Sequence, residues 1–397
     1  MIPRHAAATL ERLALGFPLV LITGPRQSGK TTLARSSFPD KPYASLENPE
    51  TRAFAVRDPR AFLRQYPDGA VLDEVQRCPD LLSWLQGHVD ERGRMGDFVL
   101  TGSAQFDLMA GVAQSLAGRV GRVELLPLSI AELRAADRLP LQLPAMLWQG
   151  SYPALYDRAV RPDDWYANYV ATYLERDVRQ LLAVRDLSQF QIFVQMCAAR
   201  TGQMLNLASL ASDCGVSAVT ARHWLSVLEA SYIVTLLRPD HRNLGKRLVK
   251  TPKLYFLDTG LAAWLLGIRD AGALAIHAAR GALFETLIVS DAIKADWNHG
   301  QPARLSFWRD QRGHEIDLLR ETPEGLQAIE IKSGSTFASD WIAPLNHWLA
   351  LAHVQPPQGI VIHGGDQDTN REGVEVMGWR SVGPIHPEPS RSRARPD

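Results

Sequence analysis

The chain has 397 residues, 46% hydrophobic and 22% charged, and its 43 basic residues balance 43 acidic ones. This length exceeds what one hydrophobic core ordinarily serves, so we expect two or three domains. The neutral balance excludes an overall field that would draw the chain to nucleic acid or to a membrane, so such a partner must meet a local patch. The three cysteines, Cys78, Cys197 and Cys214, are scattered without metal-ligand spacing, which indicates reduced thiols and a cytoplasmic protein.

The first part of the chain, residues 1–140, alternates short apolar runs with helical stretches. This alternation predicts a parallel sheet covered on both faces. The first run lacks the pattern of a signal peptide, and no run approaches the ~20 apolar residues of a membrane span, so we expect no membrane association. The expected strands are residues 18–22, 70–73, 98–102 and 123–128.

The stretch GPRQSGKTT follows the first of these strands, precedes an expected helix and satisfies the pattern G-x-x-x-x-G-K-[ST]. Its glycines let backbone N–H groups point at phosphate oxygens, and the helix N-terminus favours an anion. We predict that Lys30 reaches the β- and γ-phosphates and that Thr31 ligates Mg²⁺. A glycine turn without a ligand is the alternative. The predicted nucleotide-binding residues are Gly24, Pro25, Arg26, Gln27, Ser28, Gly29, Lys30, Thr31 and Thr32.

Two further strand ends carry polar residues that suit nucleotide hydrolysis. Asp73 and Glu74 end the second strand, and the carboxyl ends of parallel strands meet at one edge of a sheet. We predict that Asp73 holds Mg²⁺ through water and that Glu74 polarises the attacking water; an ordinary turn is the alternative. Ser103, with Thr101 as the second choice, ends the next strand and is placed to sense the γ-phosphate, although Thr-Gly-Ser is equally common in turns.

Two arginines in SLAGRVGRV, Arg119 and Arg122, are candidates for an arginine finger. A guanidinium delivered to the γ-phosphate, in cis or from a neighbouring subunit of a homo-oligomer, would stabilise transition-state charge. Two solvated surface arginines are the equally acceptable alternative.

The order GPRQSGKTT, VLDEVQ, LTGSAQ, SLAGR…LLPLS, GSYPAL, YLERDV and KLYFLDTGL resembles prokaryotic AAA-type ATPases that carry a C-terminal domain of unknown function. The resemblance implies an α/β multidomain chain with a P-loop NTPase parallel sheet, a helical and winged-helix middle and a restriction-endonuclease-like C-terminal fold. It also implies ATP as the nucleotide, since the loop itself recognises phosphates and not the base. The expected parts are residues 1–140, 141–255 and 256–383, followed by a disordered Pro-, Ser- and Arg-rich tail at 384–397.

A helix-turn-helix rhythm runs through residues 206–229. Leu207, Leu210 and Ala211 would pack inward, Gly215 permits the turn, and Ser217 caps a second helix whose inward residues are Trp224, Leu225 and Leu228. Six of the eight basic residues between positions 200 and 253 lie in RPDHRNLGKRLVKTPK, a stretch that phosphates would attract. A protein-interaction or lid module is the alternative. The predicted nucleic-acid contacts are Thr220, Arg222, His223, Arg242, Lys246, Arg247 and Lys250.

The C-terminal part contains Glu285 in an expected helix, Asp317 in EIDLL, and Glu330 and Lys332 in IEIK. Strand alternation places Glu330 and Lys332 on one face, and an adjacent strand would bring Asp317 alongside. Two carboxylates would then hold a second Mg²⁺ while the lysine assists a water. The pattern resembles the D…E-x-K core of restriction-type nucleases, with Glu285 matching the acidic residue of their first helix. Residues 254–397 hold thirteen basic and eighteen acidic residues, and this negative balance would repel DNA. A nuclease-like fold without catalytic activity is therefore the alternative.

Other candidate sites are weaker. The eleven histidines show no close pair with metal spacing, so we expect no zinc site. Ser151 in GSYPAL lacks the surroundings of a nucleophile and is interpreted as a turn residue.

The sequence therefore favours an Mg²⁺-dependent ATPase that couples its nucleotide state to DNA binding or processing. Two alternatives stay open: a nucleotide-switched protein-interaction module with an inert nuclease-like domain, and a defence-type Mg²⁺-dependent nuclease.

Overall fold

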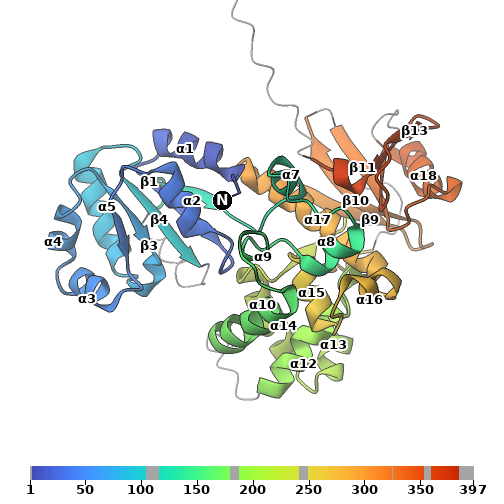
Figure 1. Cartoon of the computed structure of the whole chain (residues 1–397), viewed down its shortest axis with the longest axis horizontal. Coiled ribbons are helices and arrows are strands. Elements are labelled where there is room, and N and C mark those ends of the chain that lie inside the picture. The colour runs from blue at the N-terminus through green and yellow to red at the C-terminus, as the bar shows by residue number, and fades with distance from the viewer. Residues whose placement is uncertain are drawn as a thin grey trace, which may run out of the picture.

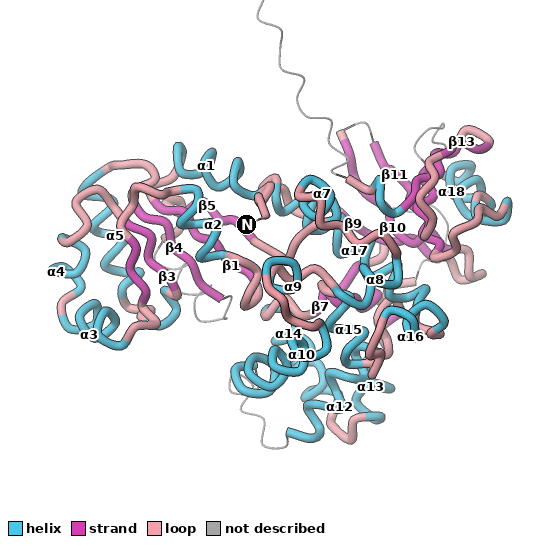
Figure 2. The backbone as a smooth tube through the Cα atoms, in the orientation of Figure 1, coloured by secondary structure: helices cyan, strands magenta, loops and turns pink. Residues whose placement is uncertain are grey.

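The computed structural model describes residues 2–103, 116–178, 187–240, 249–323, 325–352 and 359–383. Figure 1 shows a sheet with flanking helices at the N-terminal end, a helical middle, and a second sheet at the C-terminal end. The backbone in Figure 2 shows the same division, with most strands gathered into the two end sheets. Within the described residues, no helix is both long enough and apolar enough to cross a bilayer. The tail expected at 384–397 lies outside the described residues.

The N-terminal region is a five-stranded parallel sheet in the order β2-β3-β4-β1-β5, which confirms the predicted parallel sheet. All of β1 is buried, since helices cover both faces. Leu19 and Leu21 pack with α3, α4 and α5, whereas Val20 and Ile22 pack with α1 and α2. The bounds are β1 Leu19–Gly24, β2 Tyr43–Ser45, β3 Ala70–Asp73, β4 Phe98–Ser103, β5 Val120–Glu124, α1 Ala6–Gly16, α2 Lys30–Ser37, α3 Pro49–Arg57, α4 Pro59–Arg64, α5 Leu81–Arg92 and the 3₁₀ turn η1 Val75–Arg77.

The last predicted strand of this sheet is displaced. The apolar run at 123–128 predicts a strand there, but β5 is Val120–Glu124. The backbone of Leu125 still bonds to Thr23, and the chain then leaves the sheet, so that Leu126 and Leu128 enter the core of the middle region. The run is apolar because it passes from one core to another. The short edge strand β2 has no counterpart among the predictions.

The middle region is mostly helical and ends in a small antiparallel sheet of order β6-β8-β7. Rings of Tyr152, Trp165, Tyr166 and Tyr169 pack on one another in its core. The bounds are α7 Ile130–Ala135, α8 Leu143–Gln149, α9 Ala154–Asp157, α10 Pro162–Tyr169, the π-helix η2 Val170–Val178, α12 Leu187–Ala198, β6 Gln203–Met204, α13 Leu207–Asp213, α14 Ala218–Ala230, β7 Val234–Leu237, β8 Lys253–Phe256, α15 Thr259–Leu265 and α16 Ala271–Ile276.

The predicted helix pair at 206–229 is present as α13 and α14. Asn206 caps α13 through the backbone N–H of Ser209, and Ser217 caps α14 through that of Thr220. Gly215 has a φ of 66°, in the left-handed region that favours glycine. The residues predicted to pack inward are buried or half-buried: Leu207, Leu210, Ala211, Trp224, Leu225 and Leu228.

The C-terminal region is a mixed six-stranded sheet of order β13-β14-β12-β11-β10-β9. The pairs β9/β10 and β10/β11 are antiparallel, and β11/β12 and β12/β14 are parallel. The long helix α17 packs against β11, and α18 contacts β10, β11 and β12. The bounds are α17 Arg280–Asn298, β9 Leu305–Arg309, β10 Glu315–Thr322, β11 Gly325–Lys332, η3 Ser339–Trp341, α18 Ala343–Ala352, β12 Gly359–His363, β13 Thr369–Arg371, β14 Val374–Gly378 and η4 Trp379–Ser381.

One hydrophobic core joins the middle and C-terminal regions. The same cluster contains Leu228 of α14, Leu254 of β8, Leu287 of α17 and Ile329 of β11. The expected boundary between residues 255 and 256 therefore falls inside β8 and inside this continuous core. Helix α17 also contacts α1 and β5 of the N-terminal region, so one helix touches all three parts of the chain.

Candidate functional site

The loop between β1 and α2 is shaped by glycine. Gly24 has a φ of 148° and Gly29 a φ of 96°, values that L side chains rarely adopt. A Cβ at Gly24 would lie 2.1 Å from the carbonyl oxygen of Leu125. The loop thus turns tightly at the carboxyl end of a central strand and leads into the N-terminus of α2, a position where backbone N–H groups can bind an anion.

Lys30, the first residue of α2, is buried beneath this loop. Its ammonium donates hydrogen bonds to the carbonyl oxygens of Gly24 (3.0 Å) and Pro25 (2.7 Å). Burial lowers the pKa of Lys30 to about 8, although the carboxylates of Glu74 and Asp73 oppose the decrease. The loop therefore encloses a desolvated cation whose hydrogen bonds to carbonyl groups can be exchanged for bonds to phosphate oxygens.

Asp73 at the end of β3 faces the start of α2. One of its oxygens accepts hydrogen bonds from the hydroxyls of Thr31 (2.8 Å) and Thr101, and the other accepts one from Tyr43 (2.8 Å). Burial and the hydrogen bond to Asp73 raise the pKa of Tyr43 to about 12. The structure brings Thr31 and Asp73 together as hard oxygen donors, the type that Mg²⁺ prefers.

Glu74 and Ser103 share one partner, Gln76. Its side-chain amide donates to the carboxylate of Glu74 and to Oγ of Ser103 (2.9 Å). Glu74 is held in the left-handed region, with a φ of 58°, and its N–H donates to Thr101 Oγ1 (3.3 Å). The sequence analysis overlooked Gln76 and Tyr43; the signal for Gln76 is a polar residue directly after the Asp-Glu pair.

The loop opens onto a cleft of about 410 Å³ between the N-terminal and middle regions. The guanidinium of Arg26 lies 5.9 Å from the ring centre of Tyr173, so the two sides of the cleft approach each other. The cleft is lined by Arg26, Gln27, Gly29, Lys30, Thr31, Thr32, Glu47 and Glu74 on one side, and by Pro153, Ala154, Asp157, Arg158, Tyr169, Thr172 and Tyr173 on the other.

Neither candidate arginine finger reaches this cleft in cis. Arg119 precedes β5 at the opposite edge of the parallel sheet, where its carbonyl accepts from Leu19 at the start of β1, and its guanidinium pairs with Asp90 (2.6 and 2.8 Å). Arg122 lies in the middle of β5 and pairs with Glu124. Neither arginine lines the cleft, because Arg119 lies at the amino end of the parallel sheet and Arg122 is held by Glu124. A finger supplied by a neighbouring subunit stays a prediction.

A different arginine, Arg4, contacts the loop from behind. It donates to the carbonyl oxygens of Ser28 (2.7 Å) and Leu126 (2.6 Å) and to the carboxylate of Glu132 (3.1 Å). The sequence offers no signal for this role, since Arg4 lies outside every motif. Arg4 thus connects the loop to the segment that enters the middle region.

Ser151, expected to be a turn residue, belongs to a buried polar network. Its hydroxyl donates to Asp258 (2.9 Å) and lies 2.9 Å from the ammonium of Lys294, which also donates to the carbonyl of Leu128 (3.2 Å). Asp258 in turn accepts from Tyr166 (2.6 Å). Ser151 therefore connects the middle region to α17. Because it is fully buried, its hydroxyl needs these hydrogen-bond partners.

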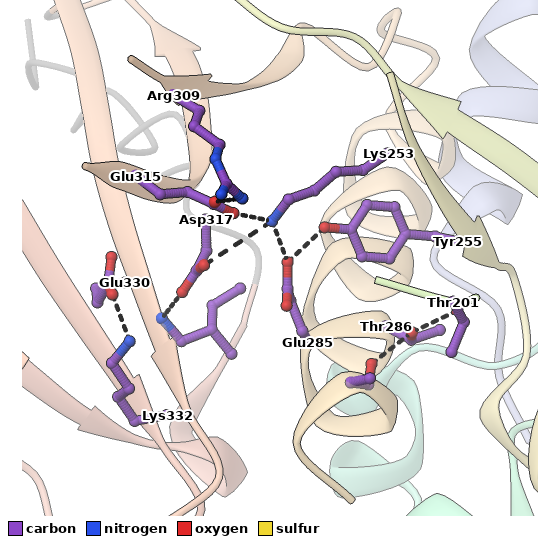
Figure 3. Close-up of polar contacts among 12 residues, drawn as sticks. Thr201, Lys253, Tyr255, Glu285, Thr286, Arg309, Glu315, Asp317, Glu330 and Lys332 are labelled. Carbon is purple, nitrogen blue, oxygen red and sulfur yellow. Dashed lines mark hydrogen bonds and ion pairs between the residues drawn. The ribbon is translucent and has the colours of Figure 1, made fainter. Parts of the chain in front are cut away.

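A second polar cluster lies where β8, α17, β10 and β11 meet (Figure 3). The ammonium of Lys253 is 2.8 Å from Glu285, contacts Glu315, and lies 4.0 Å from Asp317. Tyr255 also donates to Glu285. The structure thus places the predicted residues Glu285 and Asp317 close together, but with a lysine from another region between them. Lys253 was missed by sequence reasoning; a lysine within the apolar strand KLYFL is the signal that could have found it.

Glu330 and Lys332 form a separate pair on β11. They share one face of the strand, as predicted, and the intervening Ile331 donates its N–H to Asp317 (2.8 Å). In Figure 3 this pair and the Lys253–Glu285 pair lie on either side of Asp317. The other three predicted residues, Glu285, Glu330 and Lys332, therefore converge on Asp317.

The carboxyl groups of this cluster are strongly perturbed. Burial and the Asp317 charge raise the pKa of Glu285 to about 7 against the effect of Lys253, and raise that of Glu330 to about 8 against the effect of Lys332. Burial raises the pKa of Asp317 as well. Oε2 of Glu330 is buried without a hydrogen-bond partner among the described residues. Clustered carboxylates with a partnerless buried oxygen fit a hard divalent cation.

The predicted nucleic-acid residues are only partly described. Arg222 and His223 are exposed on α14, Thr220 is half-buried, and Lys250 is exposed before β8. Arg242, Lys246 and Arg247 lie outside the described residues.

Although the sequence has no closely spaced pair of histidines, the fold brings two histidines and an aspartate together. Asp310 and His314 of the β9–β10 turn and His347 of α18 place one potential ligand atom each within 4.8 Å of one another. Asp310 and His314 already bond to each other at 2.8 Å, and all three contact solvent. His347 is 33 residues from His314 in the sequence, which explains why a search for closely spaced histidines could not predict the cluster.

Comparison with protein families gives the class of the protein. Residues 16–134 match the AAA domain family AAA_14, and the chain is a P-loop ATPase of the AAA type. Residues 141–272 match a domain of unknown function, DUF8612, and residues 280–382 match another, DUF4143.

Curated relatives show the particular family. The uncharacterized protein Rv2008c of Mycobacterium tuberculosis and the uncharacterized protein Mb2031c of Mycobacterium bovis are each 37% identical over 341 residues, covering 84% of this chain and 74% of theirs. The chain belongs to their family, AAA-type P-loop ATPases that carry a C-terminal domain of unknown function.

Solved structures are more distantly similar. They include the Walker-type ATPase PABY2304 of Pyrococcus abyssi (15% identity, 67% of this chain and 96% of that one, TM-score 0.42). AMPPCP-bound DnaA from Aquifex aeolicus is 15% identical, over 56% of this chain and 85% of that one, with a TM-score of 0.30. RuvB of Thermotoga maritima is 19% identical, over 59% of this chain and 87% of that one, with a TM-score of 0.30. At these scores the similarity carries no argument about function.

Proposed function

We propose that this chain is an Mg²⁺-dependent ATPase that couples the state of its nucleotide to the binding or processing of DNA by its middle and C-terminal regions. The observation that carries this proposal is the cleft at the P-loop, which is lined from both the N-terminal and the middle region. A nucleotide in that cleft would touch both regions, so its hydrolysis would change how they pack.

The roles proposed at the nucleotide follow from the contacts. Gly24–Thr32 would surround the phosphates, and Lys30 would exchange its carbonyl partners for phosphate oxygens. Thr31 and Asp73 fit Mg²⁺, which would neutralise phosphate charge when bound. Glu74 would orient the attacking water, and Gln76 would keep Glu74 and Ser103 in register with the γ-phosphate.

For DNA, the proposal rests on the helix pair α13–α14 with the strands β7 and β8 as a winged helix. Arg222, His223 and Lys250 are exposed and available to phosphates. A restriction-endonuclease-like fold is supported by the positions of the acidic residues, on one helix and two adjacent strands, and by the fit of the Glu285, Asp317 and Glu330 carboxylates to a second divalent cation.

The decisive experiment measures ATP turnover by the full chain with and without DNA at two salt concentrations. We expect stimulation that fades between low and physiological salt, because phosphate contacts release counterions. Arg222→Ala and Lys250→Ala should each reduce the salt dependence of DNA binding by about one contact. Turnover and binding that ignore DNA at both salt concentrations would contradict the coupling to nucleic acid.

One observation favours a second function, a nucleotide-switched interaction with a protein. Val219 at the start of α14 is 80% exposed, so the helix that would read DNA presents an apolar side chain to solvent. A protein partner would bury it, and binding would respond only mildly to salt. Val219→Ser removes the apolar surface without adding charge, so it should weaken binding of such a protein partner and leave DNA binding nearly unchanged.

Nuclease activity is tested separately. Asp317→Ala and Glu330→Ala should each abolish Mg²⁺-dependent cleavage while leaving ATP turnover intact. Cleavage that survives both changes would exclude this cluster as its source.

A further inference from the structure

Lys253 occupies the centre of the acidic cluster. Its side chain is 4% exposed, and its ammonium contacts Glu285 and Glu315 with Asp317 at 4.0 Å. The ring of Phe307 lies 5.4 Å away and closes another side. These carboxylates raise the pKa of Lys253 despite its burial, so the side chain is charged. The Lys253 ammonium thus lies among three half-buried carboxyl groups, of which Glu315 also pairs with Arg309 at 2.7 Å.

This lysine comes from a different part of the fold. It begins β8, which pairs with β6 and β7 of the middle region, whereas Glu285 lies on α17 and Asp317 on β10. Strand alternation puts Lys253 and Tyr255 on the same face of β8, and both reach Glu285 (Figure 3). The middle region therefore supplies the positive charge to a cluster whose negative charges belong to the C-terminal region.

The ammonium and a divalent cation exclude each other at this point. A metal bound by Glu285 and Asp317 must lie about 2.0–2.6 Å from their oxygens, and the nitrogen of Lys253 already lies 2.8 Å from Glu285. Their charges would also repel strongly in a buried site. The partnerless Oε2 of Glu330 shows that the lysine leaves ligand capacity in the cluster unused.

We propose that Lys253 is an exchangeable counter-cation, which stabilises the cluster without metal and must leave before a divalent cation binds Glu285 and Asp317. This inference rests on the proposed metal site. The exchange needs only rotation of the flexible four-carbon side chain. Because Lys253 is anchored on β8, a shift of the winged helix would change how easily it leaves, and metal loading would follow the position of that region.

A purely structural ion pair between regions would explain the same contacts. The two roles differ in how the chain responds to metal. Loss of a structural partner lowers stability whatever the metal concentration, whereas loss of a competing cation lowers stability in chelator and increases the response to metal.

The test uses the full chain without nucleotide, as wild type, Lys253→Met and Lys253→Arg. Lys250→Met, three residues earlier and exposed, is the matched control. Melting temperature is measured in chelator and in Mn²⁺, and Mn²⁺ binding is followed by electron paramagnetic resonance. Each measurement is repeated with Asp317→Asn added, so that binding at the P-loop is subtracted.

In chelator, Lys253→Met should melt several degrees below wild type, since its carboxylates have lost their counter-charge. Mn²⁺ should raise its melting temperature more than that of wild type, and its Mn²⁺ affinity should be about ten-fold higher or more. Lys253→Arg and Lys250→Met should behave like wild type. If Lys253→Met folds only in Mn²⁺, the proposal is equally supported; Lys253→Met/Glu285→Gln, which loses one charge of each sign, should then fold in chelator.

Equal Mn²⁺ affinity in wild type and Lys253→Met would overturn the exchange while leaving the metal site standing. If no variant shows Mn²⁺ binding that depends on Asp317, the metal site itself fails, and the exchange with it. Neither result depends on whether the chain cleaves DNA.

Discussion

The hydroxyl oxygen of Tyr232 lies 3.2 Å from Oγ1 of Thr23, which joins the turn after α14 to the last residues of the strand before the P-loop. The same hydroxyl donates to Glu124 of β5 (2.7 Å). Tyr232 has a φ of 56°, so the turn holds it in a conformation uncommon for a bulky residue. The side chain of Tyr232 thus connects the end of the proposed DNA-binding helix α14 to the strand that leads into the nucleotide loop.

Tyr232→Phe should remove these hydrogen bonds while the aromatic ring still fills its place in the core. We expect a loss of about 1 kcal/mol in the free energy of unfolding, the typical value of a buried hydrogen bond. Nucleotide binding should persist, but ATP should no longer slow hydrogen exchange in α14. Tyr156→Phe is the control, because it removes a hydroxyl whose partners among the described residues, Gly150 and Met146, both belong to the middle region. Equal ATP-dependent protection in wild type and Tyr232→Phe would exclude this coupling.

Lys30→Ala should abolish hydrolysis. The loop encloses the charged ammonium of Lys30, and removal of a preorganised electrostatic contact typically costs about 100-fold or more in turnover. Steady-state phosphate release measures the effect. Lys41→Ala serves as the control, since Lys41 bonds to the carbonyls of Asp68 and Asp97 at a distance from the loop. Unchanged turnover in Lys30→Ala would refute the assignment of the loop.

The P-loop was predictable because its chemistry is local: glycines, lysine and threonine act within nine residues of each other. Asp73 was predictable for a related reason, as parallel strands deliver their carboxyl ends to one edge. Tyr43 was missed because its strand is three residues long and carries no apolar pattern. Lys253 and Arg4 were missed because each meets its partners only through the fold.

The candidate arginines illustrate the opposite error. A guanidinium delivered to the γ-phosphate would stabilise the transition state, but the sequence does not say which end of a strand an arginine occupies. Arg119 precedes β5 and therefore lies at the amino end of the parallel sheet, away from the loop. The strand at 120–124 is displaced from the predicted one for a similar reason. An apolar run indicates that residues are buried, but not that they pair with a neighbouring strand.

Arg4 should affect nucleotide affinity although it lies outside the P-loop motif, because it bonds to the carbonyl oxygen of Ser28 in the loop. Arg4→Ala removes the contacts to Ser28 and Leu126 and leaves the buried Glu132 unpaired. We expect about 3 kcal/mol less stability in denaturant unfolding and weaker binding of a fluorescent ATP analogue. Arg12→Ala, on the exposed side of the same segment, should change neither. If Arg4→Ala binds the analogue as wild type does, then the loop keeps its shape without this brace.

Asp291 of α17 provides a test of pH dependence. Burial raises its pKa from 3.8 to about 6, against the opposing charge of Lys294, while its carboxylate accepts the N–H of Ile130 at 2.7 Å. The folded chain therefore keeps this proton to a higher pH than the unfolded chain. The contribution of Asp291 to stability is fully present below about pH 4 and is lost as pH rises through 6. That loss is on the order of 3 kcal/mol.

Asp291→Asn cannot ionise, so its free energy of unfolding should fall less steeply between pH 4 and 6. Urea unfolding at several pH values measures the slope, with Asp40→Asn on the surface as the control. A slope identical to that of wild type would mean that Asp291 is ionised throughout this range and that Lys294 fully compensates its burial.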